Sequence, residues 1–377
     1  MGVNNDIVRH VEFTLTIPVW PVPRLLASFR PRPSPRNPFA PMKKFFFLFS
    51  LLVCLSSLAA QDPVFSQFYA SPLRLNPAFA GVGTAPRVAF NYRAQHTTYP
   101  SAYTTVAASY DQPIENTPSG LGLRMMTDNQ LEGAYKNTEV AIVYSYDVMI
   151  NRDVHARLGL SGGILSTSLD FSSLTFGDVL DPTVGNNGGI TTEQLAALSK
   201  TSADFGAGVL ISAYNVYGGV SFEHMNRPDE SLIELGQNLY AGRPMRTSIT
   251  GGAQIKVKRY SNRRRPAYVT PNFLFTSQAA FRQLNLGAYL GYGPVAFGGW
   301  YRHAFENADG FIAAVSVRHD VLKIGFSYDA VVSDLRNVPG GLGPTLEASL
   351  IVDFGNSKEL QRRRKADRYN DCYGMFR

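Results

Sequence analysis

Side chains that could catalyse hydrolysis lie near the C-terminal end of the chain, at His303, His319, Asp320 and Asp329. A histidine oriented by an aspartate can take a proton from a nucleophilic hydroxyl group. Catalysis would also need that nucleophile within reach, and the sequence shows no set of nucleophile, base and orienting residue around these positions. We therefore predict no catalytic residues and no enzymatic activity.

Metal and cofactor sites are not indicated by the sequence. The 6 histidines do not have the spacing of metal ligands. Glycine motifs occur at Gly120-x-Gly122, Gly206-x-Gly208 and Gly340-Gly341-x-Gly343. We interpret them as places of close packing, kinks and turns rather than as phosphate-binding loops. The prediction is no metal and no cofactor.

A basic run close to the C-terminus is a candidate partner-binding site, formed by Arg362, Arg363, Arg364 and Lys365. Such runs are typically solvated. If this tail faces the periplasm, it could instead dock on acidic protein or cell-wall surfaces, with Tyr373-Gly-Met-Phe376 as an apolar anchor. Both interpretations stay open.

The elements that position these residues are indicated by a repeated alternation. From Arg87 to Phe354 the chain is a series of stretches of roughly ten residues in which apolar and small or polar residues alternate, each closed by Gly, Pro, Asn or Asp. This pattern predicts an all-β fold, an antiparallel transmembrane β-barrel of the outer-membrane type over residues 86–354. No stretch after residue 60 is long and apolar enough for a transmembrane helix.

The alternation also predicts which face each side chain occupies. Val140, Ile142 and Tyr144 share one face of a strand, and Glu139 lies on the other. The stretches 323–329 and 346–354 alternate in the same way. A charge facing lipid at mid-membrane costs about 2–4 kcal/mol, so the charged residues of these strands should face the lumen or the interface. We expect Arg302 and Arg318 to join ion-pair networks there.

Counting from turn to turn predicts fourteen strands. Their approximate ranges are 86–96, 102–112, 119–128, 137–149, 154–166, 204–214, 216–225, 245–258, 267–277, 281–292, 295–304, 309–318, 321–330 and 343–354.

The even strand count determines which side of the membrane each loop faces. Both termini are then periplasmic, and the long loops 167–203 and 226–244 face outside. Turns at Gly293-Pro294 and His319-Asp320 are short and periplasmic, whereas 258–266 is a longer, basic exception. This parity puts His303 and His319 at opposite rims, some 25 Å apart, which also disfavours joint catalysis.

A signal peptide precedes the barrel over residues 42–60. Two lysines follow Met42, then come an apolar run and the small residues Ala59-Ala60. We expect cleavage between Ala60 and Gln61. Residues 1–41 are proline-rich without alternation, so we expect Met42 to be the true start and 1–41 to be non-native or disordered.

Processing changes the charge balance of the chain. Residues 1–60 hold 7 basic and 2 acidic side chains, and residues 358–377 hold 7 and 3. The remaining body therefore has 22 basic against 24 acidic side chains. The basic isoelectric point thus gives no reason to predict nucleic acid as a partner. Only Cys372 remains after cleavage, so no intramolecular disulfide is expected.

Particular residues along this architecture resemble those of a known family. The segment with Gln61, Asp62, Pro63, Phe65, Ser66, Gln67, Asn76, Pro77 and Gly81 is similar to the mature N-terminus of the PorP/SprF family of the type IX secretion system. Further landmarks are Asp178, Tyr301, Arg302, Tyr328 and Asp329. The resemblance covers essentially all of residues 61–354.

The resemblance implies a non-enzymatic protein of the Gram-negative outer membrane in the Bacteroidetes group. Members support secretion through the type IX machinery or surface attachment of its cargo, including gliding adhesins. The implied partners are periplasmic and lipoprotein components linked to the motor, secreted surface cargo and outer-membrane lipid. Whether this chain is a core component or a dedicated anchor stays open.

Two further points concern the segments that flank the barrel. Residues 61–85 should be irregular and lie against the periplasmic mouth or plug it, while residues 355–377 form a basic periplasmic tail. Asn76-Pro77-Ala78 matches an aquaporin tripeptide, but it occurs once and outside any apolar helix, so a turn is expected. A porin or small-molecule transporter is the alternative function, because a barrel alone allows it.

Overall fold

The computed structural model describes residues 62–98, 103–171, 180–181, 185–186, 198–232, 242–258, 267–305, 309–332, 343–356 and 376. Contacts divide the chain into two units, Met1–Ser57 and Leu58–Arg377, and the second contains all of these residues. The predicted upstream extension, signal peptide and cleavage site at Ala60 and Gln61 lie outside the described residues. So do Asp178 and the basic run Arg362, Arg363, Arg364 and Lys365.

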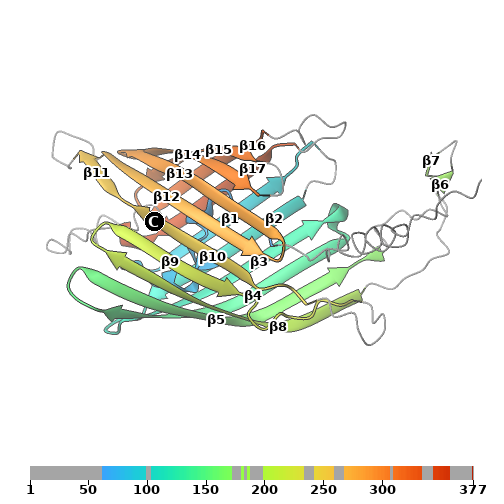
Figure 1. Ribbon diagram of the computed structural model, residues 1–377, viewed down its shortest axis with the longest axis horizontal. Helices are drawn as coiled ribbons and strands as arrows, with labels where there is room; N and C mark the ends of the chain where they lie inside the picture. Colours follow the sequence, from blue (N-terminus) through green and yellow to red (C-terminus); the bar gives the residue numbers. More distant parts are fainter. Residues whose placement is uncertain are drawn as a thin grey trace, which may run out of the picture. The chain divides into compact units, whose positions relative to one another are not determined.

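The described part of the second unit is a closed antiparallel barrel (Figure 1). Its wall consists of β1 (Arg87–Gln95), β2 (Tyr103–Pro113), β3 (Ser119–Gln130), β4 (Tyr135–Met149), β5 (Val154–Leu169), β8 (Leu198–Ala213), β9 (Val216–Glu223), β10 (Arg246–Ala253), β11 (Ile255–Lys258), β12 (Ala267–Gln278), β13 (Phe281–Tyr292), β14 (Val295–Ala304), β15 (Gly310–His319), β16 (Leu322–Val331) and β17 (Thr345–Asp353).

The first and last strands close the wall. β1 pairs with β17 from Arg87 opposite Asp353 to Ala94 opposite Leu346. β10 and β11 both pair with β12 and are two halves of one wall strand, interrupted at Gln254. Counted in this way the barrel has fourteen strands, and the predicted fold is confirmed.

The strands beside the longest loop are longer than predicted. β5 continues to Leu169 and β8 begins at Leu198, so the predicted loop 167–203 includes residues of both strands. Thr167 pairs with Lys200 in this extension. Side chains need to face lipid only within the membrane. Polar residues can therefore continue the strand pairing where the apolar alternation has ended. Alternation alone therefore placed these two boundaries wrongly.

The wall has its apolar side chains outside. Ile142 is 65% exposed and Phe326 is 57% exposed, whereas Glu139 on β4 is 1% exposed. This arrangement is the reverse of a soluble core and is the one that a lipid-facing wall requires. It confirms the predicted faces of these strands.

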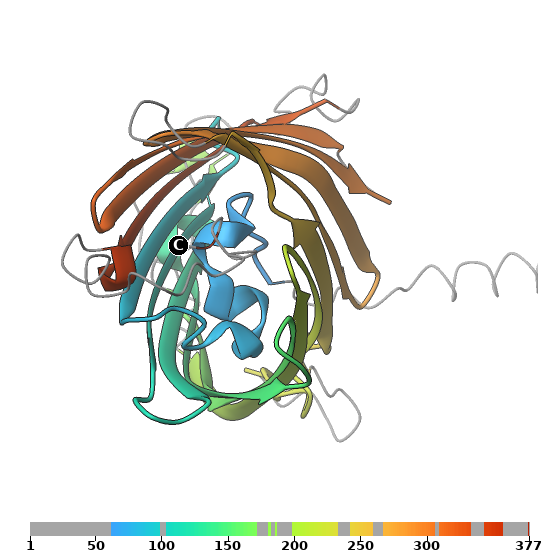
Figure 2. The same ribbon diagram turned by 90° about the vertical axis from the view of Figure 1, so that its left-hand side faces the viewer.

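The N-terminal segment lies inside the barrel (Figure 2). It contains three short helices, η1 (Phe68–Ala70), α2 (Pro72–Leu75) and η2 (Pro77–Phe79), and nearly every residue from Asp62 to Gly81 is buried. Pro72 and Pro77 each stand at a helix start, where their missing N–H costs nothing, and they prevent one longer helix. We call residues 62–81 the plug.

Within the described residues, no helix has the length and apolar character needed to cross a membrane. The remaining elements lie between or after the wall strands. They are η3 (Leu131–Gly133), η7 (Phe354–Asn356) and the paired β6 (Leu180–Asp181) and β7 (Gly185–Asn186).

Candidate functional site: the plug and the lumen wall

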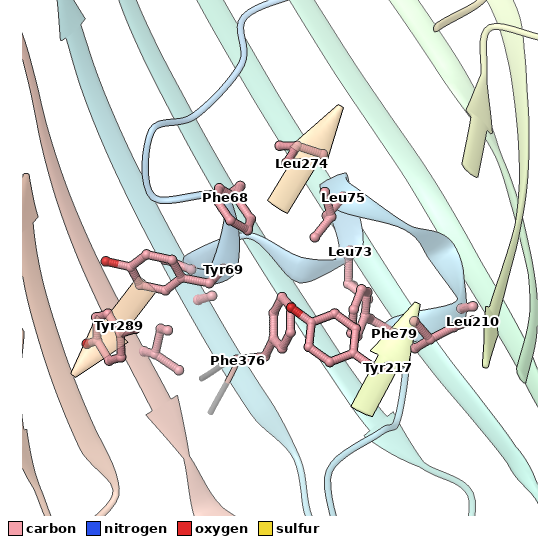
Figure 3. Close-up of a cluster of buried hydrophobic side chains, with 14 of the residues drawn as sticks. Phe68, Tyr69, Leu73, Leu75, Phe79, Leu210, Tyr217, Leu274, Tyr289 and Phe376 are labelled. Atoms are coloured by element: carbon pink, nitrogen blue, oxygen red, sulfur yellow. The ribbon is translucent and has the colours of Figure 1, made fainter. Parts of the chain in front are cut away.

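Buried aromatic residues join the plug to one side of the wall. The ring of Tyr69 stacks on Trp300 at 5.6 Å between centroids and lies 5.2 Å from the ring of Tyr289. Trp300 donates through Nε1 to Asn272 at 2.7 Å, so its polar edge is satisfied. Figure 3 shows Tyr69 beside Tyr289 in this cluster. The lumen thus contains a hydrophobic core that the plug completes.

An imidazole between two carboxylates anchors the start of the plug. His224 directly follows β9, with Nε2 2.7 Å from Asp62 Oδ2 and Nδ1 2.9 Å from Asp204 Oδ1. The other oxygen of Asp62 accepts from Arg243 at 2.8 Å. All four side chains are buried. Since both ring nitrogens face acceptors, the ring donates to both only as the imidazolium.

The surroundings of this cluster favour that charge state. Burial by itself would lower the pKa of His224, but Asp62 and Asp204 raise it to about 9. Burial would raise the pKa of Asp62, but His224, Arg243 and Arg246 hold it well below its usual range. The group is therefore a cation held between anions at neutral pH.

The same cluster has some of the composition of a metal site. Ligand atoms of Asp62, Glu223 and His224 lie within 4.8 Å of one another. Both nitrogens of His224 are engaged by carboxylates, and Glu223 pairs with Arg124 and Arg246. A metal requires a free lone pair on the imidazole, and these contacts leave none. We interpret the cluster as an ion-pair network.

A chain of alternating charges continues across the lumen from the plug. Arg74 in α2 pairs with Glu139 on β4, and Arg124 on β3 lies 2.9 Å from the same carboxylate. Arg124 also pairs with Glu223, which pairs with Arg246 on β10. All five side chains are buried. Because removing one partner from such a network typically costs about 3–5 kcal/mol, the wall charges depend on Arg74.

A second polar contact holds the plug just before its first short helix. The backbone N–H groups of Ser66 and Gln67 each donate to Glu347 on β17 at 2.8 Å, one to each carboxylate oxygen. Arg93 on β1 pairs with the same carboxylate. Glu347 is 4% exposed, so its charge is satisfied by the plug backbone and one arginine. This contact lies where the first and last strands meet.

The four C-terminal landmark residues lie on both faces of the wall. Asp329 accepts from the hydroxyl of Ser66 at 3.0 Å and pairs with Arg302 inside. Tyr301 and Tyr328 point to the outer face, where they are 39% and 50% exposed. Of these four residues, Asp329 contacts the plug through Ser66, and Arg302 is its partner on the lumenal face. For Arg302, the expected lumenal ion pair is confirmed.

The Asn76-Pro77-Ala78 motif forms a turn and is bound to the wall. Asn76 accepts from the N–H of Ala78 at 2.9 Å, which caps η2. Its Nδ2 donates to the backbone carbonyls of Val209 and Val220, each at 3.1 Å. These two residues face each other on β8 and β9. One amide thus satisfies the turn and bridges two wall strands.

Glycines in the wall make room for the plug. A Cβ atom at Gly159 would lie 2.2 Å from the backbone nitrogen of Ala78. At Gly120 it would lie 2.3 Å from the carbonyl oxygen of Ala80, and at Gly208 2.1 Å from Oδ1 of Asn76. Real Cβ atoms do not approach so closely, so these positions require glycine.

The plug ends at a charged pair near the start of β1. Gly81 has a positive φ of 61°, which favours glycine, and its N–H donates to Asp111 at 2.9 Å. Arg87 donates to the other oxygen of Asp111 through Nε, also at 2.9 Å. The chain thus passes from the plug into the first wall strand beside a fully buried salt bridge.

Pro63 and Phe65 line a small pocket between the plug and the wall. Leu274 and Arg246 form part of its wall side. Phe65 also packs with Ala107 in a separate apolar cluster. Both landmark residues therefore contribute to packing.

The candidate hydrolase residues do not form one site. His303 lies near the end of β14 that is joined to the start of β15, and its Nδ1 is 3.0 Å from Asp309. His319 is the last residue of β15 and thus lies at the opposite end of the same pair of strands. The two histidines cannot act on one substrate.

Sequence reasoning missed most of the charged residues in the ion-pair networks between the plug and the wall. They are Arg74, Arg124, Asp204, Glu223, His224, Arg243 and Arg246. Alternation could have identified the strand residues among them, because each occupies an inward position. It could not have paired them, since Arg74 and Glu139 are 65 residues apart.

The apolar outer wall and the charged, plugged interior define the class of this protein. It is an outer-membrane-type β-barrel whose lumen is occupied by its own N-terminal segment. The family model described as type IX secretion system membrane protein PorP/SprF matches residues 57–350. The chain belongs to this family.

Solved barrels of other kinds are also similar. A FadL homologue from Pseudomonas aeruginosa has 13% identity and a TM-score of 0.39, over 76% of this chain and 94% of that one. The toluene transporter TodX of P. putida has 11% identity and a TM-score of 0.41, over 74% and 92%. No curated protein sequence matches the chain significantly.

Proposed function

We propose that this chain is a plugged anchor of the type IX secretion system in the outer membrane. In this proposal it catalyses no reaction and supports secretion or surface attachment of cargo, including gliding adhesins. It binds periplasmic and lipoprotein components linked to the motor on one side and secreted cargo on the other. Membership of the PorP/SprF family supports this role.

The filled lumen is the observation that favours an anchor over an open pore. Arg74 and Asp62 place buried charges of the plug against wall charges, and Tyr69 stacks within the wall aromatics. A porin needs an aqueous lumen, whereas the described residues of the plug pack against the wall within the lumen, with small pockets between them. A filled interior suits a protein that holds a partner rather than one that passes solutes.

The loop arrangement supports two separate binding faces. Even strand parity puts the β5–β8 connection and the β9–β10 connection at one end of the barrel, and the short β8–β9 and β13–β14 turns at the other. In outer-membrane barrels long loops face outside and short turns face the periplasm. We therefore propose that cargo is held at the β5–β8 end and that both termini are periplasmic.

Deletion of the gene, followed by comparison of the secreted and surface-attached proteomes, tests the proposal. Loss of a single cargo from the surface would identify a dedicated anchor, and loss of all type IX cargo would identify a core component. Re-expression of the full chain should restore either loss. Unchanged proteomes would overturn the assignment.

Conductance in planar bilayers tests the alternative of a porin or small-molecule transporter. For the anchor we expect the purified full chain to show no large, steady channel, because the plug occupies the lumen. A porin of known conductance, reconstituted in the same way, is the positive control. A steady open channel in the intact chain would favour the pore.

A further inference from the structure

The described residue nearest the C-terminus lies inside the lumen. Phe376 is fully buried, and its ring lies 4.5 Å from the ring of Phe79 and 5.4 Å from that of Tyr217. Phe79 belongs to the plug and Tyr217 to β9. Figure 3 shows Phe376 entering the cluster beside these two rings. Phe79 and Tyr217 thus form an apolar slot for the ring of Phe376, with one side from the plug and the other from the wall.

A polar group at this slot recognises the main chain of its occupant. Arg87 donates through Nη1 to the carbonyl oxygen of Phe376 at 2.9 Å. The other edge of the guanidinium is held by Asp111, with Nη2 3.1 Å from Oδ2. Asp111 holds this guanidinium through two hydrogen bonds, so its orientation does not depend on Phe376. An apolar slot beside a preorganised donor is the usual composition of a ligand site.

The wall does not need Phe376 for closure. β17 ends at Asp353, and the β1–β17 ladder is complete at that residue. The contact of Phe376 therefore comes in addition to the barrel, and among the described residues it consists of its ring and one hydrogen bond. A contact of this size, supplied from the same chain, can be exchanged without unfolding the wall.

We propose that Phe79, Tyr217 and Arg87 form a peptide-binding site for an aromatic residue near a C-terminus, and that Phe376 of the same chain is its resident ligand. The bound ring packs on Phe79 and so locks the plug from the C-terminal side. The ligand class is a peptide with an aromatic residue whose main-chain carbonyl accepts a hydrogen bond from Arg87. This site is independent of the secretion role, because it is defined by contacts within the chain itself.

Peptide binding to a shortened chain tests the site. A chain ending at Asn370 should bind a peptide of residues 371–377, with serine in place of Cys372, at one peptide per barrel in calorimetry. The intact chain should bind it at least tenfold more weakly, because its own Phe376 competes. A peptide with Phe376→Ala should lose at least tenfold in affinity for the shortened chain.

Matched variants locate the binding within the lumen. Tyr217→Ala removes one side of the slot and should weaken binding, whereas Tyr214→Ala in the same β8–β9 hairpin removes a ring that is 58% exposed and should not. A difference in gel migration between unheated and heated samples verifies folding of each variant. Should Tyr217→Ala not fold, full-length Phe376→Ala replaces it and should bind the peptide as the shortened chain does.

Two results would overturn the proposal. One is equal affinity of the peptide for the intact and shortened chains, which would mean that Phe376 does not occupy the site. The other is equal affinity of the normal peptide and its Phe376→Ala form, which would mean that the aromatic ring is not recognised.

Discussion

At the scale of residues, the plug is held by charges that are satisfied only in contact with the wall. Asp62 contacts His224 and Arg243, and Arg74 contacts Glu139. Withdrawing the plug would leave His224 and Glu139 without those partners inside the barrel. Uncompensated buried charge costs far more than exposed charge, so the network opposes partial withdrawal. We expect the plug either to stay fully docked or to leave as a unit.

The attachment of the plug should weaken as pH rises from about 6.5 to about 9. The pKa of His224 is raised from 6.5 to about 9. The free energy that its charge contributes to holding the plug is therefore complete below pH 6.5 and is lost as pH rises past about 9. The difference between these two pKa values corresponds to at most about 3 kcal/mol of plug attachment. The charged groups facing this ring are Asp62 on the plug, Asp204 on β8, Glu223 on β9, Arg243 and Arg246.

Hydrogen exchange of the plug amides at several pH values, corrected for intrinsic rates, measures this effect. His224→Gln keeps a polar side chain but cannot become charged, so it should lower protection at pH 6 and flatten the profile above it. Lys200→Gln alters an ion pair that is one-third exposed and should leave the profile unchanged. A variant profile as steep as that of the parent would contradict the role of His224.

At the scale of elements, wall strands and plug are matched in shape. Gly159 on β5 and Gly208 on β8 face each other in the ladder, and both allow the Asn76-Pro77-Ala78 turn to approach. Such glycines would otherwise weaken a strand. Their presence in long wall strands is therefore explained by the plug rather than by the wall itself.

Gly159→Val should displace the plug, because even its Cβ would lie 2.2 Å from the backbone of Ala78. We expect the variant barrel to show frequent open events in planar bilayers, with mean conductance at least several-fold above that of the parent. Gly162→Ala on the same strand is the control, since its Cβ meets only a ring of Phe205 at 3.5 Å. A silent Gly159→Val barrel that is folded would show that the plug tolerates the shift or that the lumen stays blocked without it.

At the scale of the whole molecule, strand parity separates two faces. The β2–β3 turn and the β3–β4 turn lie at opposite ends of the barrel, because β3 runs from one end of the wall to the other. Every other connection follows the same alternation. The sidedness of one turn therefore determines the sidedness of the molecule.

Two cysteine variants should establish that sidedness in intact cells. Asn116 in the β2–β3 turn and Glu132 in the β3–β4 turn are both exposed and both have a φ of 59°, so replacement by cysteine strains them equally. In a Cys372→Ser background we expect a membrane-impermeant maleimide to label Glu132→Cys and not Asn116→Cys. Labelling after outer-membrane permeabilisation checks that Asn116→Cys is reactive. The reverse pattern would contradict periplasmic termini.

The wall of this protein could be predicted from local spacing along the chain. Alternation has a period of two residues and needs no distant contact, so it identified the fourteen strands, the outward face of Ile142 and the inward face of Glu139. It was wrong at the ends of β5 and β8, where pairing continues through largely polar residues. The family resemblance also depended on local motifs, and the family match supports it.

How the lumen is filled became clear from the folded chain alone. The sequence left residues 61–85 either across the mouth or inside, because their partners lie far away along the chain. Ser66 reaches a residue 281 positions distant, and Asp62 reaches His224 over 162 positions. Which inward charges meet depends on the closure of the barrel, which brings β1 beside β17. That is the physical reason why the wall could be predicted from local spacing and the plug could not.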